Sequence, residues 1–273
     1  MTKYQKPFLK WAGNKYRYLD KIFAQFPTKA NCLIEPFMGS GAIFINTNYS
    51  SYILADQNAD LINLYNYLKN DGEDFIHACS EYFLDTYNNK ESFYDLRETF
   101  NNSNFTKLRA ILFVYLNRHG YNGLCRYNKS NDFNVPFGTY KQPYFPYQEM
   151  LKFYNKSQNI KFLCNNFSQT FALAQPGDLI YCDPPYVPLS NSAYFSAYTN
   201  HIFTDADQIN LANLAIEAAQ RNIYVIISNH DTEVTRQYYQ SSNISSFSAQ
   251  RLISCKAQKR QYVQELIAVF KKK

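Results

Sequence analysis

Short apolar runs that end abruptly in polar residues recur along the chain, and segments with helical periodicity separate them. The runs at residues 32–34, 52–55, 179–182 and 223–228 have the length and the bounding polar residues of buried strands. Strands that alternate with helices predict an open α/β sheet. The other expected elements are helices at 18–26, 42–46, 58–69, 74–87, 92–100, 107–116, 151–160 and 205–220, a strand at 161–163, and a closing hairpin of 247–253 and 262–270.

The alternation of strands and helices is lost between residues 71 and 147. Helical patterns persist there, but they lead into a stretch from Asn117 to Tyr144 that is rich in aromatic residues, asparagine and arginine. Loops of this kind, placed between two halves of a sheet, indicate an insertion. We therefore expect one domain made of residues 1–70 and 148–273, interrupted by a second domain of residues 71–147.

Composition and charge narrow the class of protein. A chain of 273 residues with 46% hydrophobic residues can bury a substantial core. The net charge of +6 favours an anionic partner such as a nucleic acid, although a basic enzyme without such a partner could carry the same net charge. The six cysteines include no Cys-x-x-Cys pair, which disfavours a zinc site or a disulfide framework and favours the reducing cytoplasm. We expect no signal peptide and no membrane span, because no run approaches ~20 apolar residues.

The most informative strand end is the run 179–182, which is followed by Asp183, Pro184, Pro185 and Tyr186. Proline cannot continue a central strand, so Asp183 and Tyr186 are expected at the carboxyl edge of the sheet, where open α/β sheets bind ligands. There the Asp183 carboxylate and the Pro184 carbonyl would accept the two hydrogens of an aromatic amine, and the Tyr186 ring would stack on a flat base. The simpler alternative is a strand that ends in a polar turn.

A second motif, Phe37-x-Gly39-x-Gly41, follows the strand at 32–34, and the next strand ends at Asp56. Glycines let the backbone approach a ligand, and an acid about 20 residues further on accepts ribose hydroxyls in dinucleotide-type folds. The third glycine of the dinucleotide fingerprint is missing, so S-adenosyl-L-methionine fits the motif better than NAD. Phe167 follows the strand at 161–163 and marks another candidate edge position.

The insertion carries residue types that read bases. Arg126 could bind guanine through two hydrogen bonds, and Asn122 could pair with adenine. Leu124 and Pro136 could contact a thymine methyl group or wedge into a base stack. A packed, turn-rich hairpin explains each residue better when it is taken alone. Together, however, they indicate a surface that reads bases.

Two further features admit two interpretations each. Trp11, the single tryptophan, lies between Lys10 and Lys15, which is compatible with a packed tail or with a binding segment. His230 precedes Asp231 directly after a predicted strand, which is compatible with a catalytic base, but a polar turn is the favoured interpretation.

The motifs, taken in order, closely resemble the Dam-type DNA adenine methyltransferases over nearly the whole chain. The glycine loop precedes the insertion, and the Asp-Pro-Pro-Tyr motif follows it, which is the α arrangement of the amino-methyltransferases. The segments that carry the resemblance are Phe8-Leu9-Lys10-Trp11-Ala12-Gly13, Glu35-Pro36-Phe37, Leu54-Ala55-Asp56, Tyr121-Asn122-Gly123-Leu124-Cys125-Arg126-Tyr127-Asn128, Phe133-Asn134-Val135-Pro136-Phe137-Gly138 and Tyr181-Cys182-Asp183-Pro184-Pro185-Tyr186.

The resemblance implies a Rossmann-like methyltransferase sheet with an inserted helical and hairpin domain, residues 71–147, that recognises the DNA target. It implies methyl transfer from S-adenosyl-L-methionine, without a metal, to the N6 amine of an adenine flipped out of double-stranded GATC. We expect a monomer. The implied catalytic residues are Asp183, Pro184 and Tyr186. The implied cofactor contacts are Trp11, Lys15, Glu35, Phe37, Gly39, Asp56, Phe167 and Asp183. The implied DNA contacts are Lys10, Tyr121, Asn122, Leu124, Arg126 and Pro136.

Two positions depart from the family pattern, and two other functions stay open. Asn14 stands where the family usually has glycine, and Thr139 stands where a close relative would have arginine. A DNA-binding regulator that lost catalysis could share the fold. An RNA or protein N-methyltransferase could share the catalytic corner, but those enzymes usually have asparagine in place of Asp183. Relatives that methylate cytosine usually have serine there, so the aspartate favours adenine.

Overall fold

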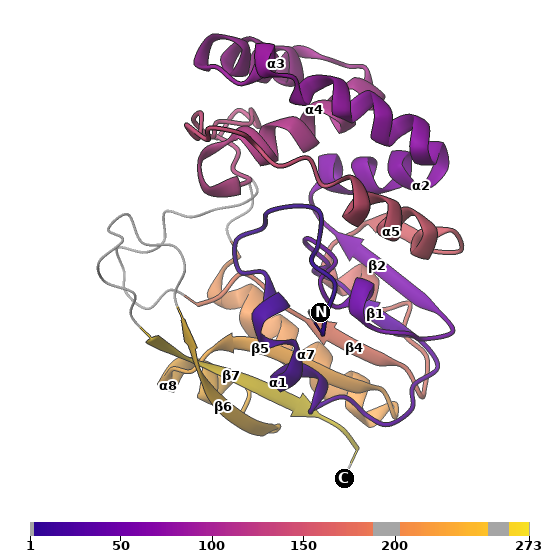
Figure 1. Cartoon of the computed structure of the whole chain (residues 1–273). Coiled ribbons are helices and arrows are strands. Elements are labelled where there is room, and N and C mark those ends of the chain that lie inside the picture. The colour runs from indigo at the N-terminus through magenta and orange to yellow at the C-terminus, as the bar shows by residue number, and fades with distance from the viewer. Residues whose placement is uncertain (1–2, 188–202, 251–261, 273) are drawn as a thin grey trace.

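The computed structural model describes residues 3–187, 203–250 and 262–272, and the strands within them form one sheet (Figure 1). The sheet has seven strands in the order β3-β2-β1-β4-β5-β7-β6, and every neighbouring pair is parallel except those that involve β7. The predicted α/β sheet is thus confirmed. The strands are β1 (Leu33–Glu35), β2 (Tyr52–Asp56), β3 (Lys161–Cys164), β4 (Leu179–Cys182), β5 (Tyr224–His230), β6 (Asn243–Gln250) and β7 (Tyr262–Phe270).

The strand order reverses between β1 and β4. From β1 the chain moves to β2 and β3 on one side, whereas β4 leads to β5 on the other side. The two strands are paired in parallel register, with Leu33 opposite Leu179 and Ile34 opposite Ile180. In open α/β sheets, ligands bind outside the carboxyl ends of the strands at such a reversal.

Side chains from the two faces of the sheet enter separate hydrophobic clusters. Ile34 and Ile180 pack with helix α7 (Asp205–Gln220), whereas Leu33 and Leu179 pack with α1 (Leu19–Phe23) on the opposite face (Figure 1). This alternation follows from the two-residue period of a strand. Helix α7 matches the predicted bounds, because Thr204 caps it in a capping box with Asp207.

The insertion is a bundle of helices that lies above the sheet in Figure 1, joined to it by α2 and α5. A third hydrophobic cluster fills it and reaches β2 and β3. The expected boundary at residue 71 falls inside α2, beside Gly72, whose φ of 54° interrupts the helix. None of the described helices is long and apolar enough to cross a membrane. The helices here are α2 (Ala59–Ser80), α3 (Lys90–Asn102), α4 (Thr106–His119) and α5 (Tyr147–Ser157), with short 3-10 helices at Glu81–Phe83, Asp85–Tyr87 and Tyr121–Gly123.

The helix predicted at 42–46 is wrong, because only a 3-10 turn, Phe44–Asn46, forms there. The Asn46 amide donates to the carbonyl of Ala42 at 2.9 Å, and the Thr47 hydroxyl donates to the carbonyl of Ile43 at 3.0 Å. Side chains that bond to nearby carbonyls compete with helix propagation. The other short helices are the 3-10 helix Lys15–Tyr18, α6 (Phe167–Phe171) and α8 (Glu233–Tyr238); neither α6 nor α8 was predicted.

The N-terminal segment joins the sheet to the insertion through one buried asparagine. Asn117 on α4 is 1% exposed. Its Oδ1 accepts a hydrogen bond from the backbone N–H of Lys10 at 2.9 Å, and its Nδ2 donates to the carbonyl of Lys10 at 2.7 Å. Nearby, the ring of Phe8 packs edge-on against the rings of Tyr65 and Phe153. The segment is therefore held by both polar and apolar contacts.

We expect Asn117→Ala to lower the free energy of unfolding by about 2–4 kcal/mol, because it leaves two partly buried backbone groups of Lys10 without partners. Urea denaturation would measure the change. Asn63→Ala is the matched control, because Asn63 makes a single exposed hydrogen bond to the carbonyl of Thr106. Equal losses in the two variants would contradict this account.

Candidate active site

Two carboxyl groups meet where the strand order reverses. Glu35 is the last residue of β1, and Asp183 directly follows β4, the neighbouring parallel strand. Burial is the main cause that raises the pKa of Glu35, and the negative charge of Asp183 adds to it. The topology therefore brings together two acids that lie far apart in the sequence.

Asp183 is paired with a buried lysine. Its Oδ1 lies 2.9 Å from Nζ of Lys15, whose side chain is 6% exposed, whereas the Asp183 side chain is 20% exposed. Burial raises the pKa of Asp183 to about 6, although the Lys15 ammonium opposes that shift. At pH 7 Asp183 is therefore mainly a carboxylate, able to accept hydrogen bonds from a ligand amine.

The loop that carries Lys15 is tied to the glycine loop. Asn14 Oδ1 accepts the N–H of Tyr16 at 2.7 Å, and Asn14 Nδ2 donates to Oγ of Ser40 at 3.0 Å. The φ of Asn14 is -51°, which any residue can adopt, so a glycine is not required here. Lys15 Nζ also donates to the carbonyl of Gly13 at 2.7 Å. Asn14 thus adds a link that glycine could not supply.

Tyr186 is fixed by contacts from three elements. Its hydroxyl donates to Oε2 of Glu265 on β7 at 3.0 Å. The ring of His230, at the end of β5, packs against it at 4.8 Å with an angle of 78° between planes. Lys15 Nζ lies 4.5 Å from the centroid of the Tyr186 ring. One ammonium group therefore contacts both the carboxylate of Asp183 and the tyrosine ring.

The backbone around the two prolines is held by buried amides. Gln208 Nε2 donates to the carbonyl of Pro185 at 2.9 Å, and the N–H of Val187 donates to Oδ1 of Asn229 at 3.2 Å. Asn229 and Gln208 are themselves hydrogen-bonded at 3.2 Å. Pro184 is buried beside them. The corner that follows β4 is thus a rigid support rather than a free turn.

Glu35 is buried and protonated near neutral pH. Burial, together with the charge of Asp183, raises its pKa to about 8. Its Oε1 has no hydrogen-bond partner within the described part of the chain. A buried polar atom without a partner is costly to the fold, which makes it a candidate ligand contact.

The glycine loop packs on Trp11 and bonds to Asp56. The N–H of Gly39 donates to Oδ2 of Asp56 at 3.0 Å, and the N–H of Asn58 donates to Oδ1 at 2.9 Å. Gly39 has a φ of +46°, and a Cβ there would lie 2.8 Å from Nε1 of Trp11. The Tyr65 hydroxyl donates to the carbonyl of Gly39 at 2.6 Å. Glycine is therefore required at this position by both conformation and contact.

Three aromatic rings pack together, and one of them belongs to Phe37, which precedes the glycine loop. Phe37 and Phe167 are stacked with centroids 5.6 Å apart. Phe203, which precedes α7, contacts both rings at 5.7 and 5.5 Å. A set of flat apolar side chains beside Asp56 suits a nucleoside, because a base needs an apolar slot and a ribose needs acceptors.

The insertion presents a short hairpin with two unlike faces. Cys125 and Tyr127 are buried, whereas Arg126 between them is exposed; on the returning strand Pro136 is exposed next to a buried residue. The Arg126 Nε donates to Oδ1 of Asn134 at 2.8 Å. The predicted DNA contacts Arg126 and Pro136 are therefore exposed on the outer face of this hairpin, whereas Leu124 is half-buried and packs against the hydrophobic core.

The other predicted DNA contacts lie close to this hairpin. Tyr121 and Asn122 are exposed on the 3-10 helix before it, and Tyr121 N–H donates to the carbonyl of Pro136 at 2.8 Å. Lys10 packs against Gly123, and burial lowers its pKa to about 8. Thr139, the second departure from the family pattern, is exposed with a φ of 42°.

Two residues that the sequence interpretation missed complete the site. Glu265 holds Tyr186, and Phe203 extends the stacked pair of rings. An acid directly before the apolar run 266–270 could have signalled Glu265, which is 9% exposed. The polar turn favoured for His230 and Asp231 is not what forms: His230 is the last residue of β5, and Asp231, which follows it, is paired with Arg236 at 2.6 Å. Within the described residues, no group of three or more His, Cys, Asp or Glu could hold a metal ion.

Comparison with known proteins confirms the expected family. Residues 11–253 match the family model described as "D12 class N6 adenine-specific DNA methyltransferase". A DNA adenine methylase from Serratia marcescens is 50% identical over 270 residues, which are 98% of this chain and 100% of that protein. The DNA adenine methylases of Escherichia coli K12 and Vibrio cholerae are 48% and 47% identical over 269 residues, covering 98% of this chain and 96% and 97% of theirs.

We expect Lys15→Met to raise the pKa of Asp183 above its present value of about 6, because the variant removes the one cause that favours the carboxylate most. Titration of labelled aspartate carboxyl carbons by NMR would report the midpoint. Lys156→Met is the matched control, because Lys156 is a half-buried lysine that bonds to the carbonyl of Thr47 instead. A midpoint that stays at 6 or falls would show that Lys15 does not hold the charge of Asp183.

Proposed function

The chain belongs to the family of D12 class N6 adenine-specific DNA methyltransferases, and from this premise we propose that it methylates the N6 amine of adenine in double-stranded GATC. The methyl donor is S-adenosyl-L-methionine, and the product is S-adenosyl-L-homocysteine. The observation that carries this proposal is the corner after β4, where a carboxylate, a rigid proline backbone and a fixed tyrosine ring converge. We place its action in the cytoplasm, because the described cysteines are free thiols.

The residues at the carboxyl ends of β1, β2 and β4 fit the proposed donor. Asp56 uses its oxygens for two backbone N–H groups, yet a carboxylate has about four acceptor sites, so two remain for ribose hydroxyls. The rings of Phe37 and Phe167 suit an adenine ring. The unpaired Oε1 of Glu35 suits a polar group of the amino-acid end. Trp11, Lys15, Gly39 and Asp183 complete the proposed contacts.

The chain's own groups then orient the target amine. We propose that the Asp183 carboxylate and the Pro184 carbonyl each accept one amine hydrogen, which leaves the nitrogen lone pair free to attack. When bound, S-adenosyl-L-methionine supplies a methyl carbon whose bond to the sulfonium sulfur breaks with the electron pair staying on sulfur. The new nitrogen–carbon bond makes one amine proton acidic, and Asp183 holds that proton before it passes to solvent. Positioning of this kind can supply on the order of 7–11 kcal/mol.

Lys15 occupies the place that we assign to the amine. Its ammonium nitrogen contacts both the Asp183 carboxylate and the face of the Tyr186 ring, which are the two contacts an adenine amine and its ring would make. We propose that Lys15 stands in for the substrate and yields this place when the base enters. Such a stand-in keeps the carboxylate charged while the site is free of DNA.

The target base must leave the duplex to reach this corner. An adenine inside a double helix is shielded by stacking, so we propose that it is flipped out and stacked on Tyr186, at a cost of about a few kcal/mol. Residues 71–147 are proposed to recognise the sequence, with Arg126 and Pro136 on the outer face of the hairpin, and the half-buried Leu124 before them, reading the bases. Lys10, Tyr121 and Asn122 lie beside them.

Incubation of the protein with plasmid DNA and S-adenosyl-L-methionine tests the function. We expect GATC sites to become resistant to a nuclease that methylation blocks and sensitive to one that requires it. Asp183→Ala should lower the rate of this methylation by at least about 100-fold while DNA binding survives, because it removes the group that accepts one amine hydrogen and then the released proton. Asp178→Ala is the control, because Asp178 is a buried aspartate whose side chain bonds to the N–H of Gln175. Methylation of RNA alone, or none by the parent protein, would refute the proposal.

Arg126→Ala should reduce the discrimination between GATC and other sequences. The ratio of methylation rates on GATC and on sites with one altered base should fall by at least about fivefold, because a two-bond contact to guanine is worth about 1–3 kcal/mol of discrimination. Lys129→Ala is the control, since Lys129 is exposed at the tip of the same hairpin. That variant should alter affinity without altering the ratio. An unchanged ratio for Arg126→Ala would remove Arg126 from the reading surface.

A further inference from the structure

The hairpin that carries Arg126 is anchored by its inner face. On the strand that holds Arg126, the neighbouring Tyr127 is 9% exposed and its ring packs edge-on against Phe133 at 5.8 Å. Because side chains alternate along a strand, any contact that fixes Tyr127 inward also directs Arg126 outward. The contacts that fix the side chain of Tyr127 therefore also influence the direction of the Arg126 side chain.

The hydroxyl of Tyr127 bonds to a carboxylate. This hydroxyl donates to Oδ2 of Asp60 at 2.8 Å. Asp60 lies in the first turn of α2, and its side chain is 15% exposed. A hydrogen bond to a charged, partly buried acceptor is among the stronger contacts that one hydroxyl can make.

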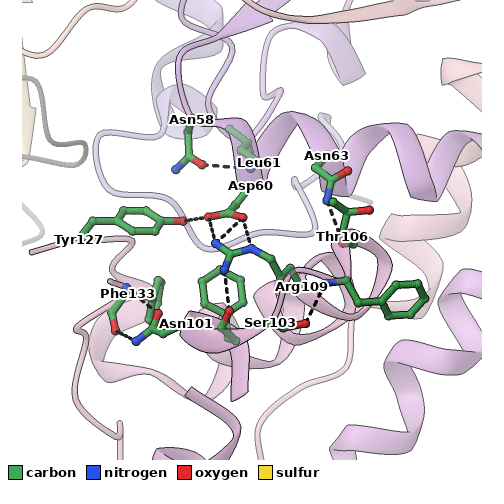
Figure 2. A network of polar contacts seen from close by, with 12 residues as sticks. Asn58, Asp60, Leu61, Asn63, Asn101, Ser103, Thr106, Arg109, Tyr127 and Phe133 are labelled. Atoms are coloured by element: carbon green, nitrogen blue, oxygen red, sulfur yellow. Dashed lines mark hydrogen bonds and ion pairs between the residues drawn. The ribbon is translucent and has the colours of Figure 1, made fainter. Parts of the chain in front are cut away.

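Asp60 is itself fixed from a second helix. Arg109 on α4 donates from Nε to Oδ1 and from the guanidinium NH2 to Oδ2, both at 2.9 Å, as Figure 2 shows. The same guanidinium donates to the carbonyl of Phe100 at 2.6 Å and lies 4.2 Å from the Phe100 ring. Arg109 is itself held in place by the Phe100 ring, and its two parallel hydrogen bonds fix the orientation of the Asp60 carboxylate.

The returning strand of the hairpin is bound through its backbone to a residue of α3. Asn101 Oδ1 accepts the N–H of Phe133 at 2.8 Å, and Asn101 Nδ2 donates to the carbonyl of Phe133 at 3.2 Å (Figure 2). These bonds pin one strand through its backbone.

The strand that carries Arg126 is joined to the returning strand by the hydrogen bond from the N–H of Asn134 to the carbonyl of Arg126 at 3.0 Å. On its inner face it is joined to α2 by the contact of Asn58 with Cys125 and by the bond of Tyr127 to Asp60. Of the two contacts with α2, only the Asp60 bond has a charged acceptor, so it contributes most to limiting how far this strand can roll.

We propose that Asp60, held by Arg109, is a positioning residue for sequence recognition, acting through Tyr127 to orient Arg126. The proposal rests on the proposed function, because it assigns a purpose to Asp60 only if Arg126 reads bases. Loss of the Tyr127 hydroxyl lets its strand roll against α2, and Arg126 then samples directions in which it cannot form two bonds to one base. The expected signature is a loss of discrimination between sequences with the reaction itself preserved.

Tyr127→Phe tests this with the loss of one oxygen atom. We expect the ratio of rates on GATC and on single-base variants to fall by about threefold or more, while cofactor affinity and the maximal rate on GATC stay within about twofold. Tyr67→Phe is the matched control, because the Tyr67 hydroxyl bonds to Oγ1 of Thr106 at 2.8 Å and likewise joins α2 to α4. The control should keep the ratio of the parent protein.

A double-mutant cycle shows whether Tyr127 acts through Arg126. If it does, Tyr127→Phe adds nothing to the ratio already lost in Arg126→Ala, so the effects are not additive. Additive losses would overturn the proposed route. An unchanged ratio in Tyr127→Phe, alongside a reduced ratio in Arg126→Ala, would overturn the role of Asp60 alone. An unchanged ratio in Arg126→Ala would overturn the reading role of Arg126, and with it this inference.

Thermal unfolding of the same proteins separates positioning from stability. A purely structural contact would lower the melting temperature of Tyr127→Phe with the ratio intact, and that result would also overturn the proposal. Asp60→Asn provides a second variant, because it keeps the shape of the side chain and weakens both the Arg109 and Tyr127 contacts. We expect it to reduce the ratio at least as much as Tyr127→Phe does.

Discussion

The site depends on one constraint, which is that carboxyl groups at the ends of two adjacent parallel strands must share a buried space. Glu35 and Asp183 meet there because the strand order reverses between β1 and β4. Two charges so close and so poorly solvated are unfavourable, and the fold resolves this unequally. Glu35 has a pKa of about 8 and keeps its proton, whereas Asp183, paired with Lys15, has a pKa of about 6 and releases it. One acid is thus left charged at the place where an amine is to be held.

Rigidity around that charge comes from groups that take no part in the proposed chemistry. Gln208 and Asn229 bond to the backbone after the two prolines, and Glu265 bonds to the Tyr186 hydroxyl. Each arrives from a different element, α7, β5 and β7, so the corner is supported on several sides. Side chains fixed in this way need little rearrangement when a ligand enters, which favours rate through positioning.

The start of α2 contacts both the proposed cofactor site and the hairpin of the insertion. Asp56 at the end of β2 bonds to the N–H of Asn58, and Asn58 Nδ2 contacts Sγ of Cys125 in the hairpin at 3.6 Å. Two residues further along, Asp60 holds Tyr127. The first turn of one helix therefore touches both the proposed ribose acceptor and the proposed reader of bases. Because one helix end contacts both the sheet and the hairpin, it fixes the position of one relative to the other.

Local patterns in the sequence were enough for the α/β class, the bounds of α7, and the strand ends at Asp56 and Asp183, because hydrophobic periodicity and caps act over a few neighbouring residues. The family resemblance also came from local motifs and is confirmed. Only the tertiary structure brought Lys15 to Asp183, Glu265 to Tyr186 and Asp60 to Tyr127, since these contacts join residues far apart in the chain. It also removed the helix expected at 42–46, where side chains compete for the carbonyls that a helix would use. Local propensity thus set the elements, whereas long-range packing decided which polar groups face one another and with what charge.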